Sequence, residues 1–324
     1  MSENIITYPA KERNSAVFQL GDDSSYQTWR ALKLSNFSTL RKDISSDLPD
    51  KTSGELAGES IVTVTDLANP QDVEISQILD SCRKTNMAIY QVHEPIAPQK
   101  LEKILEKFCL NFGLKTMENH RSAGNSGVVA IEQTTIGGKG GYIPYTDKPL
   151  SWHTDGYYNA PENRIRAMVL HCARDASEGG VNELLDPEIA YIRLRDENPQ
   201  FIASLMHPQA MIIPANEDPR SAYRPDSIGP VFEVDNQTGH LHMRYSARAR
   251  NIIWRDDPIT DQARAFLSHI LKNDPLIVRH KLHSGQGVIS NNVLHNRTGF
   301  VDTGDVGETR LMYRIRYMER VRDV

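Results

Sequence analysis

The chain has 324 residues, of which 39% are hydrophobic and 24% are charged. This is the composition of an ordinary globular protein, and it excludes a wholly disordered chain. Lys and Arg number 37 against 42 Asp and Glu, which gives a formal net charge of −5 and argues against a protein that coats nucleic acid.

Three further absences narrow the class of protein. No apolar run approaches the roughly 18 to 20 residues that cross a bilayer, so no membrane partner is expected. The first residues lack an apolar segment behind a basic start, so no secretory signal is expected. The cysteines, Cys82, Cys109 and Cys172, are widely spaced, which disfavours a disulfide framework and a cysteine-based zinc site. A cytoplasmic location is therefore predicted.

The first 60 residues differ in character from the rest of the chain. They are polar, apart from one apolar stretch from Trp29 to Phe37, and contain clusters of Ser, Asp, Gly and Lys. We interpret residues 1–60 as a lead-in segment that packs partly on a main domain over 61–324.

Strand and helix patterns alternate at the start of the predicted main domain. The β-branched run over 60–67 and the apolar run over 87–92 predict strands. Apolar residues at helical spacing predict helices over 72–85 and 97–113, the second of which is expected to end at Gly113.

From Gly127 onward, short runs of apolar and β-branched residues predict many strands. They lie near 128–133, 166–173, 181–186, 209–214, 231–235, 240–245, 277–283, 287–292 and 310–318. Helices are predicted over 187–196, after Pro199 and over 260–274, and NQTG between two alternating runs predicts a hairpin. The pattern indicates a closed or sandwiched antiparallel sheet with helices covering one side.

One short motif stands out among the eleven histidines, because H-T-D at 153–155 is the one H-x-[DE] triplet in the sequence. Residues two apart on an extended strand point to the same side, so His153 and Asp155 are expected to present an imidazole nitrogen and a carboxylate oxygen to one point. His295, at the end of the strand-like run that begins near Gly287, is the best candidate for a third ligand. Two histidines and one carboxylate on one face are typical of non-haem iron(II) oxygenases.

Two arginines follow this candidate metal site. A 2-oxoglutarate cosubstrate would bind such a metal through its keto-acid end, and its far carboxylate would need a cation. Arg310 and Arg314 follow His295 on the next predicted strand, four residues apart and therefore on one face. A guanidinium matches a carboxylate in a planar, two-pronged geometry and keeps its charge when buried. The H-T-D motif, the distant histidine and the arginines on the next strand together indicate an iron and 2-oxoglutarate site far more specifically than any one of these features alone.

The chain resembles the taurine dioxygenase superfamily of iron(II)- and 2-oxoglutarate-dependent oxygenases, including its γ-butyrobetaine hydroxylase branch. The motifs that carry the resemblance are YTDKPLSWHTDGYY (145–158), VLHCARDASEGGVNELLD (169–186), SGQGVISNNVLHNRTGF (284–300) and TRLMYR (309–314). The resemblance implies a mainly β chain with flanking helices, folded as a double-stranded β-helix, a cupin-like jelly roll. It implies Fe(II) bound by His153, Asp155 and His295. It also implies that Arg310 binds the far carboxylate of 2-oxoglutarate, and that Arg314 contacts cosubstrate or substrate.

The chain departs from the family pattern at one position. After Gly179-Gly180 the family usually places a hydroxyl residue that assists 2-oxoglutarate binding, and this chain has Asn182 there. An amide can donate a hydrogen bond to a carboxylate, so Asn182 is expected to take over that role. The presence of Asp155 implies a hydroxylase-type site instead of the halogenase variant that lacks this carboxylate.

The expected activity is hydroxylation of a C–H bond of a small, charged organic substrate, with O2 as second cosubstrate and release of succinate and CO2. A metal-dependent hydrolase at the same three residues and a non-catalytic small-molecule binder on a degenerate barrel are the alternatives. A quaternary ammonium substrate would call for an aromatic cage, and a sulfonate or carboxylate would call for an arginine. The aromatic residues available for a cage are Tyr142, Tyr145, Trp152, Tyr157 and Tyr158. The sequence leaves the substrate and the formation of a homo-oligomer open.

Overall fold

The structure is a computed structural model, and it describes residues 16–44, 60–118, 127–133, 143–216, 223–235, 238–248, 250–303, 309–322 and 324, with the backbone alone for 41–44. The chain divides into two compact units. The first comprises Met1–Ser35, Pro187–Arg244 and Ala249–Lys272, and the second comprises Asn36–Asp186, Tyr245–Arg248 and Asn273–Val324. All the predicted site residues belong to the second unit.

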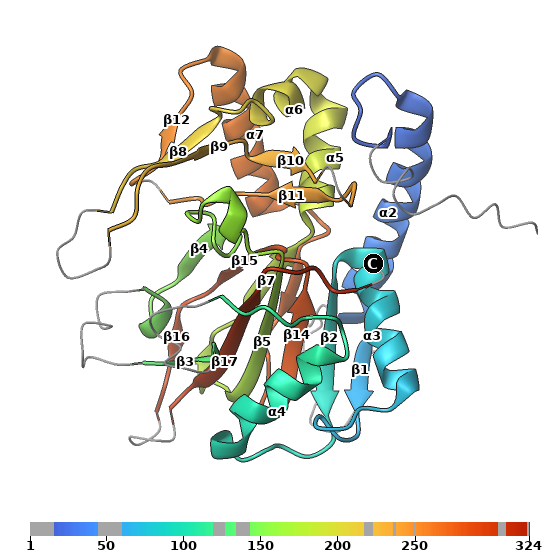
Figure 1. Cartoon of the computed structure of the whole chain (residues 1–324), viewed down its shortest axis with the longest axis vertical. Coiled ribbons are helices and arrows are strands. Elements are labelled where there is room, and N and C mark those ends of the chain that lie inside the picture. Colours follow the sequence, from blue (N-terminus) through green and yellow to red (C-terminus); the bar gives the residue numbers. More distant parts are fainter. Residues whose placement is uncertain are drawn as a thin grey trace, which may run out of the picture. The chain divides into compact units, whose positions relative to one another are not determined.

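Two larger sheets build the second unit (Figure 1). One has the strand order β1 (Ile61–Val64), β2 (Met87–Val92), β14 (Gln286–Ser290), β5 (Ala167–Arg174), β17 (Leu311–Tyr317) and β3 (Val129–Glu132). The other has the order β13 (Val278–His280), β7 (Asn182–Leu185), β15 (Leu294–Arg297) and β4 (Leu150–His153). Apart from the parallel pair β1 and β2, all these neighbours run antiparallel.

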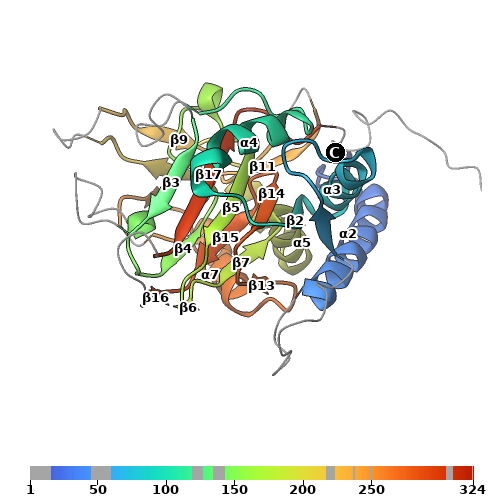
Figure 2. The ribbon, with the colours of Figure 1, turned by 90° about the horizontal axis from the view of Figure 1, so that it is seen from below.

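The six-stranded sheet lies between a helical layer and the four-stranded sheet (Figure 2). Helices α3 (Asp72–Thr85) and α4 (Pro98–Leu110) turn Ile78, Leu105 and Phe108 into a core shared with every second residue of β5 and β17. The intervening residues of these two strands face the four-stranded sheet, because side chains alternate along a strand. The two facing sheets form a jelly roll, a double-stranded β-helix, so the predicted fold class is confirmed.

Shorter elements complete the second unit. Strands β6 (Glu178–Gly179) and β16 (Phe300–Val301) form a two-stranded ladder, and η1 (Ile143–Tyr145) and η2 (Pro161–Asn163) are single 3-10 turns. The predicted helices over 72–85 and 97–113 are confirmed. Gly113 follows the second at a φ of +76°, the left-handed conformation expected of a helix-terminating glycine.

The first unit combines helices with short strands. Helices α5 (Pro187–Glu197), α6 (Pro199–Leu205) and α7 (Pro258–Asn273) accompany a sheet of order β12 (Ile253–Trp254), β8 (Met211–Ile213) and β9 (Ser227–Gly229). The predicted hairpin is present as β10 (Phe232–Val234) and β11 (Leu241–Met243). Tyr191 of α5 makes edge-on ring contacts with Phe18 and Phe232, which places the chain segment before α2 on this core.

The apolar stretch from Trp29 to Phe37 lies within a 22-residue helix, α2 (Asp23–Ile44), that the sequence analysis did not predict. Residues 1–15 and 45–59 lie outside the described part of the chain, and the domain boundary at 60/61 stays a prediction.

Two local predictions are wrong. His295 does not end the strand over 287–292, because β14 stops at Ser290 and Asn292 turns the chain at a φ of +53° into a new strand, β15, of the other sheet. Asp155 is not on an extended strand, because β4 ends at His153 and a turn begins at Asp155.

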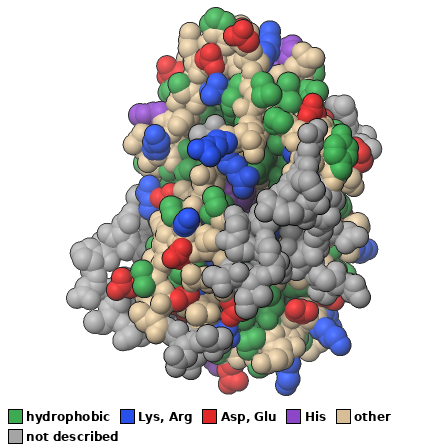
Figure 3. Space-filling model, turned by 90° about the vertical axis from the view of Figure 1, so that its left-hand side faces the viewer, with side chains coloured by type: hydrophobic (Ala, Val, Ile, Leu, Met, Phe, Trp, Pro, Cys, Tyr) green, Lys and Arg blue, Asp and Glu red, His purple; other side chains and the backbone are tan. Residues whose placement is uncertain are grey.

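No helix among the described residues is long and apolar enough to cross a membrane. On the face shown in Figure 3, Lys and Arg side chains gather near the middle, and acidic and basic side chains are interspersed over the rest of the part that the described residues form.

Candidate active site

Two histidines meet across the strand pair β4 and β15. His153 and His295 are directly opposite one another in the register, with ring centroids 4.2 Å apart. Asp155, in the turn after β4, completes a cluster in which one ligand atom from each of the three residues lies within 4.8 Å of the others. The structure therefore brings together the three residues that the sequence predicted as metal ligands, although Asp155 reaches the site from a turn.

Each imidazole is oriented by its own backbone. His153 Nδ1 lies 2.8 Å from the carbonyl oxygen of Ser151, and His295 Nδ1 lies 2.9 Å from that of Val293. A carbonyl oxygen only accepts hydrogen bonds, so both Nδ1 atoms carry the proton and both Nε2 atoms keep a lone pair. The pKa of His153 is lowered to about 3, mainly by burial and to a smaller extent by the neighbouring His295. Burial also lowers the pKa of His295. Both rings are therefore neutral at pH 7.

The backbone of Asp155 is fixed by Asn292 in the turn between β14 and β15. The backbone N–H of Asp155 donates to Asn292 Oδ1 at 2.8 Å, and Asn292 Nδ2 donates to the carbonyl oxygens of Asp155 and Ile165. The next residue, Gly156, has a φ of +67°, and a Cβ there would lie 2.4 Å from the Ile165 side chain. The turn thus needs a glycine, and the amide of Asn292 sets its position.

The carboxylate of Asp155 is held on one side by two arginines of β17. Its Oδ1 lies 3.3 Å from Arg314 Nη1 and 3.5 Å from Arg316 Nη1, whereas its buried Oδ2 has no hydrogen-bond partner among the described residues. Burial would raise the pKa of Asp155, but the charges of Arg314 and Arg316 outweigh it and hold the pKa below the usual range. Arg316 is in turn ion-paired with Glu118. An ionised carboxylate with one unpartnered oxygen is thus directed towards the histidines.

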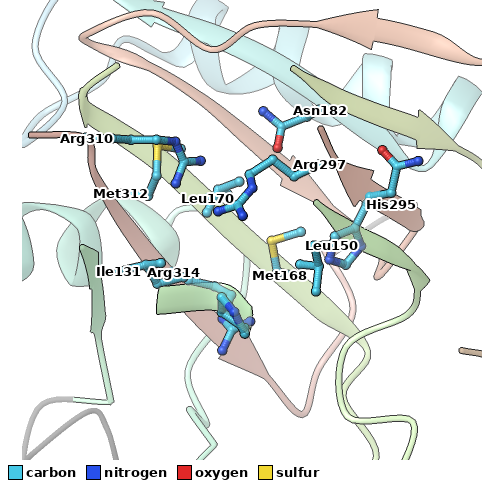
Figure 4. Close-up of a pocket in the computed structure, with 12 residues that line it drawn as sticks. Ile131, Leu150, Met168, Leu170, Asn182, His295, Arg297, Arg310, Met312 and Arg314 are labelled. Atoms are coloured by element: carbon cyan, nitrogen blue, oxygen red, sulfur yellow. The ribbon is translucent and has the colours of Figure 1, made fainter. Parts of the chain in front are cut away.

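A pocket extends from His295 between the two sheets (Figure 4). Its apolar wall comes from β3, β4, β5 and β17 and includes Ile131, Leu150, Met168, Leu170 and Met312. The polar residues that line it are Asn182, His295, Asn296, Arg297, Arg310 and Arg314. All the residues that the sequence predicted for cosubstrate binding therefore line one pocket next to a candidate metal ligand.

Arg310 lies at the far end of this pocket from His295 (Figure 4). Arg310 is buried, with 6% of its surface exposed, and no carboxylate among the described residues lies within ion-pair distance of its guanidinium. Burial lowers its pKa, although an arginine remains charged at pH 7. Asn182 is also buried, and its Nδ2 has no hydrogen-bond partner within the described chain. A buried cation beside an unused amide donor favours an anionic ligand.

The residues fit iron(II) and 2-oxoglutarate. Two imidazole nitrogens with free lone pairs and one unpartnered carboxylate oxygen form a donor set that suits iron(II) and leaves neighbouring coordination positions open. A pocket whose apolar walls lead from these ligands to the buried Arg310 suits a short-chain diacid that reaches the metal at one end.

Sequence reasoning missed three residues of this site. Asn292 and Arg316 act on Asp155, and Arg297 lines the pocket. Weak signals were available: Arg316 continues the same strand face as Arg310 and Arg314, and Arg297 follows His295 at the strand spacing of two. A signal was available for Asn292 as well, because Ser290-Asn291-Asn292 is a turn-prone cluster between two apolar stretches.

A jelly roll that holds two histidines and a carboxylate beside a pocket with a buried arginine defines the class of iron(II)- and 2-oxoglutarate-dependent dioxygenases. Comparison with known families agrees, since residues 97–316 match the family described as taurine catabolism dioxygenase TauD, TfdA family. The chain belongs to this family. The γ-butyrobetaine hydroxylase branch stays a prediction.

Solved structures share the fold at low sequence identity. The non-haem iron oxygenase OrfP, solved with iron, succinate and (3S)-hydroxy-L-Arg, is 14% identical, with a TM-score of 0.57 over 96% of this chain and 92% of that one. A taurine dioxygenase from Burkholderia xenovorans is 18% identical, with a TM-score of 0.51 over 78% and 84%. An asparagine oxygenase solved with Fe(II), a hydroxyasparagine and succinate is 13% identical, with a TM-score of 0.50 over 90% and 91%.

Proposed function

We propose that His153, Asp155 and His295 hold iron(II), that Arg310 and Asn182 bind the far carboxylate of 2-oxoglutarate, and that the protein hydroxylates a small, charged substrate. The observation that carries this proposal is the convergence of three ligand atoms within 4.8 Å at one end of a pocket whose other end holds Arg310. When bound, iron(II) and 2-oxoglutarate supply the O2-dependent oxidation that places a hydroxyl group on a C–H bond and releases succinate and CO2.

The protein's own residues provide orientation and a dry site. The carbonyl groups of Ser151 and Val293 fix the two imidazoles with Nε2 towards the metal position. Arg314 bonds Asp155 Oδ1 and also lines the pocket, so it is placed to contact either the metal-binding end of the cosubstrate or the substrate. The apolar wall formed by residues such as Met168 and Leu170 excludes water from the space between the metal and Arg310.

An acidic group on the substrate is favoured over a quaternary ammonium group. Arg248, an exposed residue, has its guanidinium carbon 5.9 Å from the ring centroid of Tyr157, and Arg316 donates to the hydroxyl of Tyr158 at 3.2 Å. The Tyr157 ring therefore already faces a cation and the Tyr158 hydroxyl already accepts from one, so a cationic substrate group at these residues would be repelled. Tyr142, another aromatic residue predicted for a cage, lies outside the described residues.

The test is succinate release by purified protein supplied with Fe(II), ascorbate and 2-oxoglutarate, with and without small carboxylates, sulfonates and amines. We expect metal-dependent succinate from the wild type, stimulated by a true substrate. Asp155→Ala and His295→Ala should abolish it and sharply weaken Fe(II) binding without unfolding the chain. His283→Ala is the matched control, because His283 is exposed and hydrogen-bonds Asp175 away from the site.

Two results would contradict this proposal. One is the absence of metal-dependent succinate from the wild type under all these conditions, and the other is full activity in His295→Ala. Zinc-dependent ester or amide hydrolysis by the same protein would favour the hydrolase alternative, which gives Arg310 no role.

A further inference from the structure

The cosubstrate pocket contains a second buried guanidinium that the proposed function does not use. Arg297 lies on β15 two residues after His295, and its side chain points into the pocket (Figure 4). Its Nη2 donates to the backbone carbonyl oxygens of Thr146 and Lys148. Its Nε is buried and has no hydrogen-bond partner in the described part of the chain. Part of this guanidinium therefore anchors a loop, and part of it is available to a ligand.

Arg297 and Arg310 line the same pocket, and the charge of Arg310 acts on Arg297 (Figure 4). Their guanidinium carbons are 4.7 and 5.1 Å from the centroid of the same Phe300 ring. Burial and the charge of Arg310 lower the pKa of Arg297 to about 10, so Arg297 still carries its charge at pH 7. Neither guanidinium has a carboxylate partner within ion-pair distance among the described residues. Two neighbouring buried cations of this kind are stabilised when an anion binds between them.

The register places the unused amide beside this pair. Asn182 of β7 is directly opposite Arg297 of β15, and directly paired residues of an antiparallel ladder project on the same face. Gly180 also lies beside Arg310, since a Cβ on it would be in van der Waals contact with Arg310 Nε at 3.6 Å. Three sets of N–H donors, from Arg297, Arg310 and Asn182, therefore surround one end of the pocket, whereas the space towards His295 is apolar.

We infer that Arg297 and Arg310 form a two-arginine clamp for the far carboxylate of the 2-oxo acid, and that the clamp makes the protein selective for a 2-oxo diacid over a 2-oxo monoacid. This inference rests on the proposed function for the identity of the ligand. A carboxylate has two oxygens with about four acceptor sites, so it can take both prongs of Arg310 together with N–H groups of Arg297 and Asn182. A monoacid would leave the two arginines facing each other without a counter-charge.

The test compares two ligands that differ only in the far carboxylate. Binding of 2-oxoglutarate and of 2-oxopentanoate to the Mn(II)-loaded protein is measured by calorimetry without O2, so that no turnover occurs. Arg297→Gln should raise the Kd for 2-oxoglutarate about tenfold to a hundredfold, because hydrogen bonds to a charged group are lost. It should leave 2-oxopentanoate within about twofold of the wild type, because that ligand has nothing for Arg297 to bind.

Arg279→Gln is the matched control variant. Arg279 belongs to the same sheet but pairs with Glu183, which neighbours Asn182 and so projects from the opposite face. This variant should leave the binding of both ligands unchanged. Arg297→Lys keeps the charge and is the second variant if Arg297→Gln does not fold. It should recover only part of the selectivity, since lysine lacks the planar fork.

Equal losses for both ligands in Arg297→Gln would mean that Arg297 only anchors the loop at Thr146 and Lys148, and would overturn the inference. Unchanged binding of 2-oxoglutarate would overturn it as well. If the wild type binds neither 2-oxo acid, the proposed function fails. A comparison of glutarate binding with pentanoate binding to the metal-free protein then still tests the clamp, because these acids do not need a metal in order to bind. Glutarate selectivity that disappears in Arg297→Gln would support the clamp, and equal binding of both acids would overturn it.

Discussion

Asn182 occupies a position at which a single side chain is expected to tune the cosubstrate. The resemblance to the family implies a hydroxyl group at this position, whereas the amide of Asn182 is buried, lines the pocket and has an Nδ2 without a partner among the described residues. A buried donor without an acceptor is costly, so the residue is best explained by a ligand that supplies the acceptor.

Substitutions at this position should separate the amide's chemistry from its size. Asn182→Ala should raise the KM for 2-oxoglutarate about tenfold to a hundredfold, since a neutral donor to a carboxylate is lost. Asn182→Thr should be tolerated because it restores a hydroxyl donor, and Asn182→Asp should be the worst because it adds a negative charge beside the ligand. Steady-state succinate kinetics give the KM. Unchanged values for the Ala and Asp variants would reduce Asn182 to a structural residue of β7.

The site residues that could be predicted from the sequence are those whose chemical role only a few residue types can fill. Imidazole and carboxylate ligands and a carboxylate-binding arginine leave few alternatives, so His153, Asp155, His295 and Arg310 were recognisable. Asn292 and Arg316 act through other side chains, and their partners become known only when β14, β15 and β17 are placed in register. Residues of this second kind have no signature of their own in a single sequence.

At the scale of elements, the two glycines Gly179 and Gly180 allow β6 to approach β16 closely. Gly179 has a φ of +70°, and a Cβ on it would lie 2.3 Å from the backbone oxygen of Gly299. The N–H of Gly180 donates to the same oxygen at 3.0 Å, and the N–H of Phe300 donates to the backbone carbonyl oxygen of Asp147 at 3.1 Å. This close approach fixes Phe300, whose ring lies near the guanidinium groups of both Arg297 and Arg310.

Gly179→Ala should therefore destabilise the protein by about 1–3 kcal/mol, because it combines a left-handed conformation with a clash against backbone that has little freedom to move. The free energy of unfolding from urea titration is the measurement. Gly21→Ala is the control, since a Cβ at Gly21 meets nothing within 4 Å, and it should change stability by less than about 0.5 kcal/mol. Equal stabilities of the two variants would show that the turn tolerates a side chain.

Elements with a complete local pattern were predictable, and those defined by a change of sheet were not. Helix α3 has its apolar spacing, acidic first turn and left-handed Asn86 at its end, and its predicted bounds are confirmed. The run from Gly287 to His295 is predicted as one strand because of its apolar and β-branched residues, although Ser290, Asn291 and Asn292 in its middle favour a turn. The break at Asn292 arises because the chain leaves the six-stranded sheet and enters the other, which is a tertiary event.

For the molecule as a whole, buried neutral histidines make the folded state sensitive to acid. His171 lies between β14 and β17, where its Nδ1 pairs with the Tyr90 hydroxyl at 3.1 Å, and burial lowers its pKa to about 4. An unfolded histidine has a pKa near 6.5. Between these values the unfolded chain binds the additional proton, so stability falls as the pH falls from about 6.5 towards 4.

His171→Gln should reduce this pH dependence while keeping a polar group beside Tyr90. The free energy of unfolding, plotted against pH within that window, should have a slope smaller by up to roughly 1.4 kcal/mol per pH unit, the contribution of one proton. Urea titrations at several pH values provide the plot. Parallel lines for variant and wild type would assign the acid sensitivity to other groups.

The strand order of the six-stranded sheet has a kinetic consequence. β5 lies between β14 and β17, and both partners come much later in the chain, so Val169 pairs with Ile289 on one side and with Ile315 on the other. The chain must close long loops before these pairings contribute any stability, which places such topologies among the slow folders, on the order of milliseconds to seconds. Until then both edges of an apolar strand are open to other molecules. Refolding yield should consequently fall as protein concentration rises, even where the native state is stable.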